Sequence, residues 1–308
     1  MPTTPRLSIG LPVFNGEMYL HQALESLLNQ TYRDFELIIV DNASTDATGA
    51  LCKEYAARDP RVRYVRQPEN VGAAENFNAA YRLGQGELFK WAAHDDTLAP
   101  DFLEKCIAVL DANPDVVLAY SRVAQIDPQG NVSGSYDYPM RVSAADPLVR
   151  FQDLVLTNHF CVAVFGVIRR AVLEKTPLIA KYVGSDRVLL AELALHGRLF
   201  EVPEYLFFRR DHPDTSGRRF TMYRRLAWFD PKQKGRLYYP YWRLGAEFFL
   251  TARRAAGNFR CRAGAYWTVA RWFFSRRRSL LEDLKAASVA AFPFLKEHLS
   301  SRRGLRPN

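Results

Sequence analysis

The sequence predicts an α/β protein with a mostly parallel central sheet flanked by helices, followed by a helical, basic C-terminal region. Short apolar runs typical of buried strands alternate, as far as residue 120, with segments in which apolar residues recur at helical spacing. Polar residues follow directly after several of these runs. Alternating strands and helices imply right-handed crossovers between parallel strands, which gives the fold class.

The first strand–helix–strand unit is the clearest part of the pattern. Residues 7–13 form an apolar run that predicts a buried strand, and the turn at 14–16 ends it. Apolar residues then recur on one helical face (Leu20, Ala23, Leu24, Leu27 and Leu28). A second run at 35–40 ends in Asp41, and residues 44–46 are candidate caps for the next helix. A carboxylate at the end of a buried strand needs a compensating partner, so Asp41 predicts a nucleotide site.

The later elements continue the alternation. We expect a strand at 62–65, a strand at 88–92, a helix at 100–112 and a strand at 116–120. A turn follows at 127–130, and residues 131–150 show no periodic pattern, so we expect them to form a loop.

The composition is that of a folded protein with one large domain and an appended piece: 308 residues, 48% hydrophobic and 24% charged. The four cysteines lie far apart with no C-x-x-C pair, which indicates thiols in a reducing compartment. The N-terminus lacks the features of a signal peptide, and no apolar run reaches the ~20 residues that span a bilayer. We therefore expect a cytoplasmic protein.

Charge divides the chain in two. Residues 209–308 hold 23 Lys and Arg against 7 Asp and Glu, whereas the first 208 residues hold 19 against 26. We expect a mildly acidic catalytic domain at 1–220 and a strongly basic, aromatic-rich helical region at 221–308.

Two motifs in the first unit resemble those that open the family 2 glycosyltransferases, whose fold is named GT-A. The turn PVFN (12–15) is similar to P-x-Y-N, and DNASTD (41–46) is similar to D-D/N-x-S-x-D. The resemblance extends to about Ser216. It implies that the base and ribose of a sugar nucleotide are held by Pro12, Phe14, Asn15 and Asp41. A doubly wound domain of another kind could also show strand, helix, strand and Asp.

The same resemblance covers the segment after the third strand. Family members close an N-x-G-x-x-x-A/N-x-N segment over the nucleotide, and a loose match is given by Asn70, Gly72, Asn76 and Asn78. Gly72 would supply a positive φ or a close backbone approach, and an ordinary loop glycine is the alternative.

His94-Asp95-Asp96 follows a predicted strand and predicts a divalent-cation site. Adjacent carboxylates repel each other, and Mg²⁺ or Mn²⁺ relieves that repulsion while sharing its ligands with substrate phosphates. The family signature is D-x-D or D-x-D-D; here Ala93 replaces the first Asp, which leaves Asp95 as the metal ligand. The alternative is that Asp95 and Asp96 cap the next helix.

Asp186 begins another predicted helix, whose buried side carries Val188, Leu189 and Leu193. A carboxylate in the first turn of a helix is held by backbone donors. Many family 2 enzymes have E-D or D-D here as the general base that takes a proton from the acceptor hydroxyl. Ser185 precedes the Asp in this chain, so Asp186 alone is the candidate base, and helix capping is the alternative.

The segment FFRRDHPDTS (207–216) resembles the family's R-x-H-x-x-x-S segment near the end of the catalytic domain. The resemblance implies that His212 is a further metal ligand or a donor to the departing diphosphate. Arg209 or Arg210 would pair with phosphate oxygens, because a guanidinium matches their geometry. Of the Q-x-x-R-W motif of processive members, only the last two positions match, at Arg271-Trp272, which favours a non-processive enzyme.

The basic region predicts a helix with arginines nearby and one apolar side, made of Ala265, Tyr266, Val269, Trp272 and Phe273. This composition is typical of an interfacial, non-spanning membrane helix. The alternative is a helical subdomain packed on the catalytic domain, with a solvated basic face. The chain has no nucleic-acid-binding motif, and its acidic nucleotide-binding part argues against nucleic acid as a partner.

The resemblance implies inverting transfer of one sugar from a UDP-, GDP- or dTDP-sugar to a saccharide or lipid-linked acceptor, assisted by Mg²⁺ or Mn²⁺. We expect a peripheral enzyme that makes a bacterial-type cell-envelope polysaccharide at the inner face of the cell membrane. Two alternatives remain. A sugar-nucleotide nucleotidyltransferase would need a Gly-rich basic loop after the first strand, which the residues at 14–17 are not. A non-catalytic scaffold is conceivable because of Ala93 and Ser185.

Overall fold

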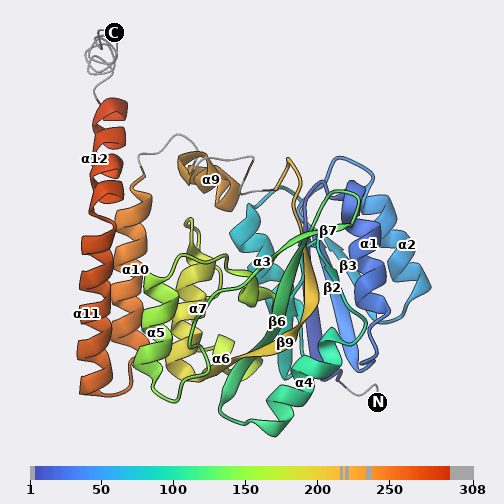
Figure 1. Cartoon of the computed structure of the whole chain (residues 1–308). Helices are drawn as coiled ribbons and strands as arrows, with labels where there is room; N and C mark the ends of the chain where they lie inside the picture. Colours follow the sequence, from blue (N-terminus) through green and yellow to red (C-terminus); the bar gives the residue numbers. More distant parts are fainter. Residues whose placement is uncertain (1–3, 216–217, 219–221, 234–237, 292–308) are drawn as a thin grey trace.

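The structure, a computed structural model, describes residues 4–215, 218, 222–233 and 238–291. One sheet lies at the centre, with helices on both faces and a group of C-terminal helices stacked outside one of them (Figure 1). From left to right, Figure 1 shows α11 (Phe259–Ser275) and α10 (Pro240–Ala255), then α5 (Pro147–Leu156) and α7 (Ser185–His196), then the sheet, then α1 (Glu17–Leu28) and α2 (Thr48–Arg58).

The amino-terminal half of the sheet is parallel, as the alternating pattern predicts. Its strands lie in the order β3 (Val62–Arg66), β2 (Phe35–Asp41), β1 (Leu7–Val13) and β4 (Leu88–Trp91). β1 and β2 pair along their whole length, from Leu7 opposite Phe35 to Val13 opposite Asp41. The turn after β1 and the loop after β2 therefore leave the sheet at the same level and lie side by side.

The other half of the sheet is mixed. β8 (Val167–Arg169) lies antiparallel between β4 and the long β6 (Val116–Ile126). β6 pairs in parallel with β9 (Arg198–Arg210), and the short β5 (Thr97–Leu98) pairs with the far side of β9. The chain therefore returns to the sheet centre after the regular alternation has ended.

The prediction of a loop at 131–150 is wrong at both ends of that segment. β7 (Val132–Tyr136) pairs with β6, and α5 begins at Pro147. Four of the five β7 residues are exposed, so the strand lacks the apolar alternation by which a half-buried strand is recognised.

Two helices begin later than the sequence pattern suggests. α4 spans Phe102–Ala112, and α2 begins at Thr48, beyond the candidate caps at 44–46. Asp46 nevertheless accepts a hydrogen bond from the Thr48 backbone N–H (3.0 Å).

The remaining helical elements are α3 (Ala73–Leu83), η1 (Val162–Phe165), α6 (Arg170–Leu173), α9 (Met222–Phe229), η2 (Pro231–Gln233) and α12 (Arg277–Ala291).

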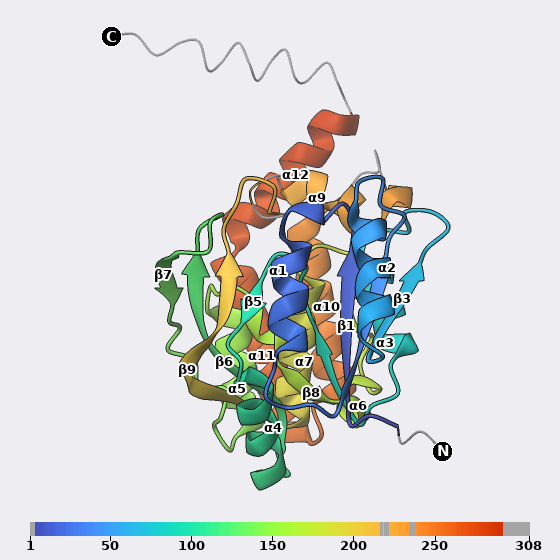
Figure 2. The ribbon, with the colours of Figure 1, turned by 90° about the vertical axis from the view of Figure 1, so that its right-hand side faces the viewer.

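Each face of the sheet has its own core. α1, α2 and α4 cover the face that Figure 2 turns toward the viewer, where Leu20 and Leu24 of α1 are fully buried. On the other face, Phe89 and Trp91 of β4 pack in one apolar cluster with α3, α5 and α7.

The C-terminal helices α10 and α11 belong to that second cluster and pack on α7 and α5. On α11, Ala265, Val269 and Trp272 are at most 3% exposed. The side of α11 predicted to meet a membrane is thus buried against protein, and the alternative of a packed helical subdomain is correct for that side. In the described part of the chain, no helix has the length and apolar character needed to cross a bilayer.

Candidate active site

The carboxyl ends of β1 and β2 carry two interlocked loops. Asn15 donates its backbone N–H to Ser44 Oγ (2.9 Å), and its Oδ1 accepts from the Thr45 backbone (2.9 Å). Gly16 packs so closely that a Cβ there would lie 2.6 Å from the His94 ring. Asn15 therefore holds the two loops together, and the absence of a side chain at Gly16 lets His94, which follows β4, pack against them.

The residues of the 12–15 turn differ in accessibility. Phe14 is 41% exposed and Asn15 is also exposed, whereas Pro12 lies inside β1 opposite Val40 and is buried. A ligand at this edge can contact the first two side chains directly, and Pro12 only shapes the strand that carries them.

Asp41 is fully buried at the end of β2. Its Oδ1 accepts from the Ser44 backbone (2.8 Å), and its Oδ2 accepts from the Tyr64 hydroxyl (2.8 Å) and the Arg66 guanidinium (2.8 Å). Burial alone would raise the pKa of Asp41, but these hydrogen bonds hold it below its ordinary value. The Arg66 side chain is 46% exposed. Asp41 therefore presents Tyr64 and Arg66 at the edge of the site, and no sequence motif points to either residue.

The loop after β3 folds against the loop after β2 and against α9. Asn42 donates to Asn70 Oδ1 (3.0 Å) and accepts from the Val71 backbone (2.9 Å). Gly72 has a φ of +86°, and a Cβ there would lie 2.5 Å from the Phe229 carbonyl oxygen in α9. Gly72 therefore has both the positive φ and the close backbone approach that predict a glycine at this position.

The other two asparagines of this segment face the protein. Asn76 is buried and donates to the Val40 carbonyl (2.8 Å), and Asn78 donates to the Ile179 carbonyl (2.8 Å). Their side chains attach α3 to β2 and to the segment before α7, so of the three predicted asparagines only Asn70 joins the loops at the site.

Asp95 and His212 come together from distant parts of the chain, after β4 and after β9. Asp95 Oδ2 and His212 Nε2 are 3.0 Å apart, and the side chains are only 18% and 7% exposed. Burial alone would raise the pKa of Asp95, but the charge of His94 and the hydrogen bond from His212 lower it. An ionised carboxylate beside an imidazole is a donor set that suits Mn²⁺.

This pair fits a divalent cation with two protein ligands. Among the described residues, no group of three or more His, Cys, Asp and Glu side chains is arranged to hold a metal ion. Substrate phosphates and water would therefore complete the shell, as is common for Mg²⁺ and Mn²⁺.

Asp96 is half-buried, and its carboxylate is bonded to the backbone and does not extend the pair. Its Oδ1 accepts from the Arg210 backbone (2.9 Å), and burial together with the charge of Asp95 raises its pKa. The residue that precedes α4 as its N-cap is Asp101. The alternative that Asp95 and Asp96 cap this helix is therefore wrong.

Arg210 is committed to the protein and is 1% exposed. Its guanidinium donates to the carbonyls of Asp95 (3.0 Å) and Pro128 (3.0 Å) and to Gln22 Oε1 (2.6 Å). These bonds fix the backbone of Asp95, the predicted metal ligand, against α1, so in this structure the Arg210 guanidinium is not free to pair with a phosphate.

Arg209 points to the other side of β9. Its guanidinium lies over the rings of Phe160 (5.0 Å) and Tyr136 (5.7 Å) and donates to the Tyr136 hydroxyl (2.8 Å). Phe160 is 49% exposed, and its ring meets Tyr136 edge to face at 4.8 Å between centroids. These three side chains form a half-exposed aromatic cluster next to the residues that follow β9.

Asp186 reaches the same edge of the sheet through α7. β9 starts directly after this helix and pairs Arg198 with Val116, at the amino end of β6. The C-terminal end of α7 therefore lies at the amino edge of the sheet, and the 12-residue helix, about 18 Å long, extends from there to Asp186 at the other edge. Asp186 is half-buried in the first turn of α7, as predicted.

The surroundings of Asp186 include residues that no motif indicates. Burial, followed by the charge of Asp186, raises the pKa of the Cys161 thiol. Burial lowers the pKa of Arg225 on α9, and Asp186 opposes that shift. Arg187 holds the chain before Cys161 in place by donating to the Thr157 (2.9 Å) and His159 (2.6 Å) carbonyls.

These features define an α/β protein with a nucleotide-type site at the carboxyl ends of its parallel strands. The family model described as glycosyl transferase family 2 matches residues 8–176, more than half of the chain, and the chain belongs to that family. The predicted GT-A fold and glycosyltransferase class are confirmed, which favours a transferase over the nucleotidyltransferase and the scaffold.

Named relatives align with parts of this chain. Chondroitin synthase of Escherichia coli is 36% identical over 137 residues, which are 44% of this chain and 20% of that protein. An uncharacterized glycosyltransferase of Haemophilus influenzae is 35% identical over 127 residues, 41% of this chain and 50% of that one. The chain thus matches half or less of the length of these relatives.

Two solved structures share the fold over most of the chain. TarS 1-349 of Staphylococcus aureus in complex with UDP gives a TM-score of 0.64 at 15% identity, covering 88% of this chain and 71% of that one. The mannosyltransferase PcManGT of Pyrobaculum calidifontis, in complex with GDP-Man and Mn²⁺, gives 0.56 at 18% identity, covering 99% and 82%.

Proposed function

We propose that this glycosyltransferase moves one sugar from a nucleotide diphosphate sugar to an acceptor hydroxyl, with inversion at the anomeric carbon. The observation that best supports the proposal is the convergence, at one edge of the sheet, of the Asp41 loop, the Asp95–His212 pair and Asp186. Nucleoside, diphosphate and acceptor would each meet one of these groups.

The donor nucleoside would lie against Phe14 and Asn15, beside Asn70 and the pair Tyr64–Arg66 that Asp41 orients. UDP and GDP are donor classes to test first, because structures of proteins with this fold contain UDP and GDP-Man. A dTDP-sugar remains a third candidate. The exposed guanidinium of Arg66, and that of Arg209, could pair with phosphate oxygens.

Asp95 and His212 would hold Mn²⁺ or Mg²⁺, in keeping with the Mn²⁺ in the PcManGT complex. A bound cation supplies Lewis-acid stabilisation of the charge that develops on the diphosphate. Arg210 would keep the Asp95 backbone in place for this task.

Asp186 would act as the general base. It takes the proton of the acceptor hydroxyl while the hydroxyl oxygen forms a bond to C1 of the sugar. The bond from C1 to the diphosphate oxygen breaks on the opposite side, and its electron pair leaves with the diphosphate, which accounts for inversion. Cys161 and Arg225, which adjoin Asp186, would orient its carboxylate.

The acceptor would be a saccharide, free or lipid-linked, used for a cell-envelope polysaccharide at the cytoplasmic face of the membrane. The cluster of Tyr136, Phe160 and Arg209 suits a sugar, because aromatic rings stack on the apolar faces of saccharides and a guanidinium donates to hydroxyls. Phe160 precedes Cys161, the neighbour of Asp186, so a sugar on this cluster would have its hydroxyls near the base.

The test is a thermal-shift and calorimetric panel of UDP-, GDP- and dTDP-sugars, with and without Mn²⁺, on the wild type, Asp95→Ala and Asp186→Asn. We expect one nucleotide class to raise the midpoint in a Mn²⁺-dependent way. Asp95→Ala should lose this effect. Asp186→Asn should keep donor binding while transfer falls about 10²–10⁴-fold. Unchanged transfer in Asp186→Asn would remove that residue from the mechanism.

A further inference from the structure

The helix α11 has a second apolar side, opposite the one that packs on α5 and α10. Phe259, Trp267 and Phe274 on this side are 87%, 66% and 71% exposed. Trp267 and Phe274, seven residues apart, lie almost in line along the helix, and Phe259 lies within about 80° of them on the same side. Leu281 of α12 is also exposed, by 55%. A helix that is apolar on two opposite sides needs a second apolar environment for the outer one.

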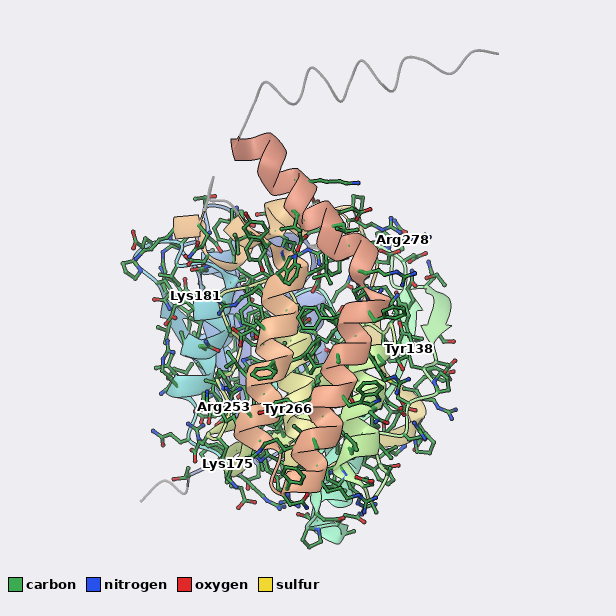
Figure 3. The ribbon with its side chains drawn as sticks, turned by 90° about the vertical axis from the view of Figure 1, so that its left-hand side faces the viewer. Tyr138, Lys175, Lys181, Arg253, Tyr266 and Arg278 are labelled. Carbon is green, nitrogen blue, oxygen red and sulfur yellow. The ribbon has the colours of Figure 1, made fainter. Side chains whose placement is uncertain are left out.

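The neighbouring helix α10 widens this line into a surface. Figure 3 shows α10 and α11 side by side on the outside of the molecule, with Arg253 and Tyr266 on this side. Phe249 and Leu250 of α10 are 46% and 41% exposed, and Phe249 stacks on Tyr266 of α11 at 4.7 Å between centroids. We call the exposed side of α10, α11 and the start of α12 the outer face.

Exposed apolar side chains concentrate on the outer face. Of the thirteen large hydrophobic side chains that are exposed in the described part of the chain, eight lie on α10–α12. A patch of this kind on a folded protein marks a site of interaction with a membrane or another macromolecule.

The charge around the outer face is almost entirely positive. Arg260, Arg271 and Arg278 are exposed, and no carboxylate among the described residues pairs with them. Arg277 lies over the Phe274 ring at 4.8 Å. Within the described residues 240–286, Glu282 is the one exposed carboxylate. Exposed Trp and Phe between unpaired arginines are what an interfacial helix presents to anionic lipid.

We propose that the outer face docks on the surface of an anionic lipid bilayer, with Trp267 and Phe274 inserted among the headgroups and the arginines on lipid phosphates. A second copy of the chain is a poorer occupant, because a two-fold contact would bring the arginines of both copies together without carboxylates to pair them. Lipid binding by the outer face needs neither the sugar donor nor catalysis. The proposal rests on the proposed function only in one respect, the use of an acceptor at the membrane surface.

The test is co-sedimentation of the full chain with vesicles of phosphatidylcholine alone and of an equal mixture of phosphatidylcholine and phosphatidylglycerol. We expect binding to the mixed vesicles only, weakened by salt. The variant Trp267→Ser/Phe274→Ser should lower the partition coefficient at least about tenfold. Val132→Ser removes a side chain that is 67% exposed on β7, a strand that is not part of the outer face. This control variant should bind vesicles as the wild type does.

Three results would overturn the proposal. The first is equal binding of the wild type to vesicles with and without phosphatidylglycerol, and the second is unchanged vesicle binding of the double variant. The third is a dimer of the wild type in light scattering that the double variant does not form, with no vesicle binding by either protein. The thermal midpoint and the donor affinity of each variant show that it is folded. They also separate a failure of lipid binding from a failure of the proposed transfer.

Discussion

Asp41 begins the second of the two motifs in the first strand–helix–strand unit, and the residues around it explain that motif physically. The carboxylate is buried and accepts hydrogen bonds from Ser44, Tyr64 and Arg66, so it holds the loop after β2 against β3 and fixes one exposed guanidinium. A carboxylate with these hydrogen bonds stabilises the carboxyl edge of the sheet and also positions the groups that a ligand would meet there.

Replacing Asp41 by Asn should therefore lower the free energy of unfolding by about 1–3 kcal/mol at neutral pH, because the amide cannot serve both Arg66 and the Ser44 backbone as a charged acceptor. Folding lowers the pKa of Asp41. Its contribution to the free energy of unfolding is therefore complete above the pKa of the unfolded chain, about 3.9, and is lost as the pH falls through the pKa of the folded protein. Urea unfolding at neutral and acid pH measures the gap between the two proteins. Asp34→Asn, at an exposed position, is the control, and a gap no larger than the control's would contradict the assignment.

Lys90 in β4 is a buried cation that the catalytic scheme does not use. Its ammonium donates to the Trp91 carbonyl (3.2 Å) and lies over the Phe102 ring at 4.7 Å. Burial lowers the pKa of Lys90 to about 7. Between that value and the unfolded value near ~10.4, the unfolded chain binds more protons, so Lys90 makes stability rise with pH across this window.

The variant Lys90→Met should remove this rise, which amounts to at most about 1.4 kcal/mol per pH unit. Urea unfolding of both proteins between neutral pH and pH ~10 gives the two slopes. Lys53→Met, at an exposed site, should keep the wild-type slope. Parallel curves for wild type and Lys90→Met would show that Lys90 keeps its ordinary pKa in the folded protein.

Among the elements, α9 is held at the site by Gly72. This residue has φ +86° and ψ 160°, a conformation open essentially to glycine alone, and it faces the Phe229 carbonyl directly. Gly72→Ala should cost about 1–3 kcal/mol of stability and weaken donor binding, because the loop and α9 must separate. Gly134→Ala, where a Cβ would meet nothing within 4 Å, is the matched control. Calorimetric donor titration and urea unfolding give both quantities, and equal behaviour of the two variants would separate α9 from the site.

The strands and helices that sequence reasoning finds are those whose signal is local. β1, β2 and α1 carry apolar residues at the spacing of their own structure, so their positions can be predicted without knowledge of the fold. β7 could not be found in this way, because four of its five residues are exposed and its place depends on pairing with β6.

The same reasoning explains α11. Helical periodicity identified the side with Val269 and Trp272 as apolar, but it cannot tell whether protein or lipid covers that side. The structure shows protein there, and it is the side with Phe259 and Trp267 that lacks a partner among the described residues.

In the candidate site, motifs predicted the residues that follow strand ends, and the structure adds partners that are distant in sequence. Asp95 and His212 are 117 residues apart, and both lie in recognisable motifs. Arg66 and Arg225 approach Asp41 and Asp186 only because the chain folds, and an isolated arginine in a sequence carries no sign of such a role.

Over the whole molecule, charge divides the chain near the end of β9. The first 208 residues have seven more acidic than basic side chains and contain the Asp41 loop, the proposed metal ligand Asp95 and the proposed base Asp186. The remaining 100 residues have sixteen more basic than acidic side chains, and their described part includes the helices of the outer face. Such an asymmetry would orient the protein on an anionic surface with its acidic part turned away.

The central claim is that Asp95 and His212 form a working donor site in a glycosyltransferase. The most direct measurement is the release of nucleoside diphosphate from UDP-, GDP- and dTDP-sugars in the presence of Mn²⁺ and without acceptor. It is made on the wild type, Asp95→Asn and His212→Gln. We expect slow hydrolysis of one donor class by the wild type and loss of it in both variants, each of which should keep its fold by circular dichroism. Wild-type turnover in Asp95→Asn, or no turnover of any donor class by the wild type, would contradict the account.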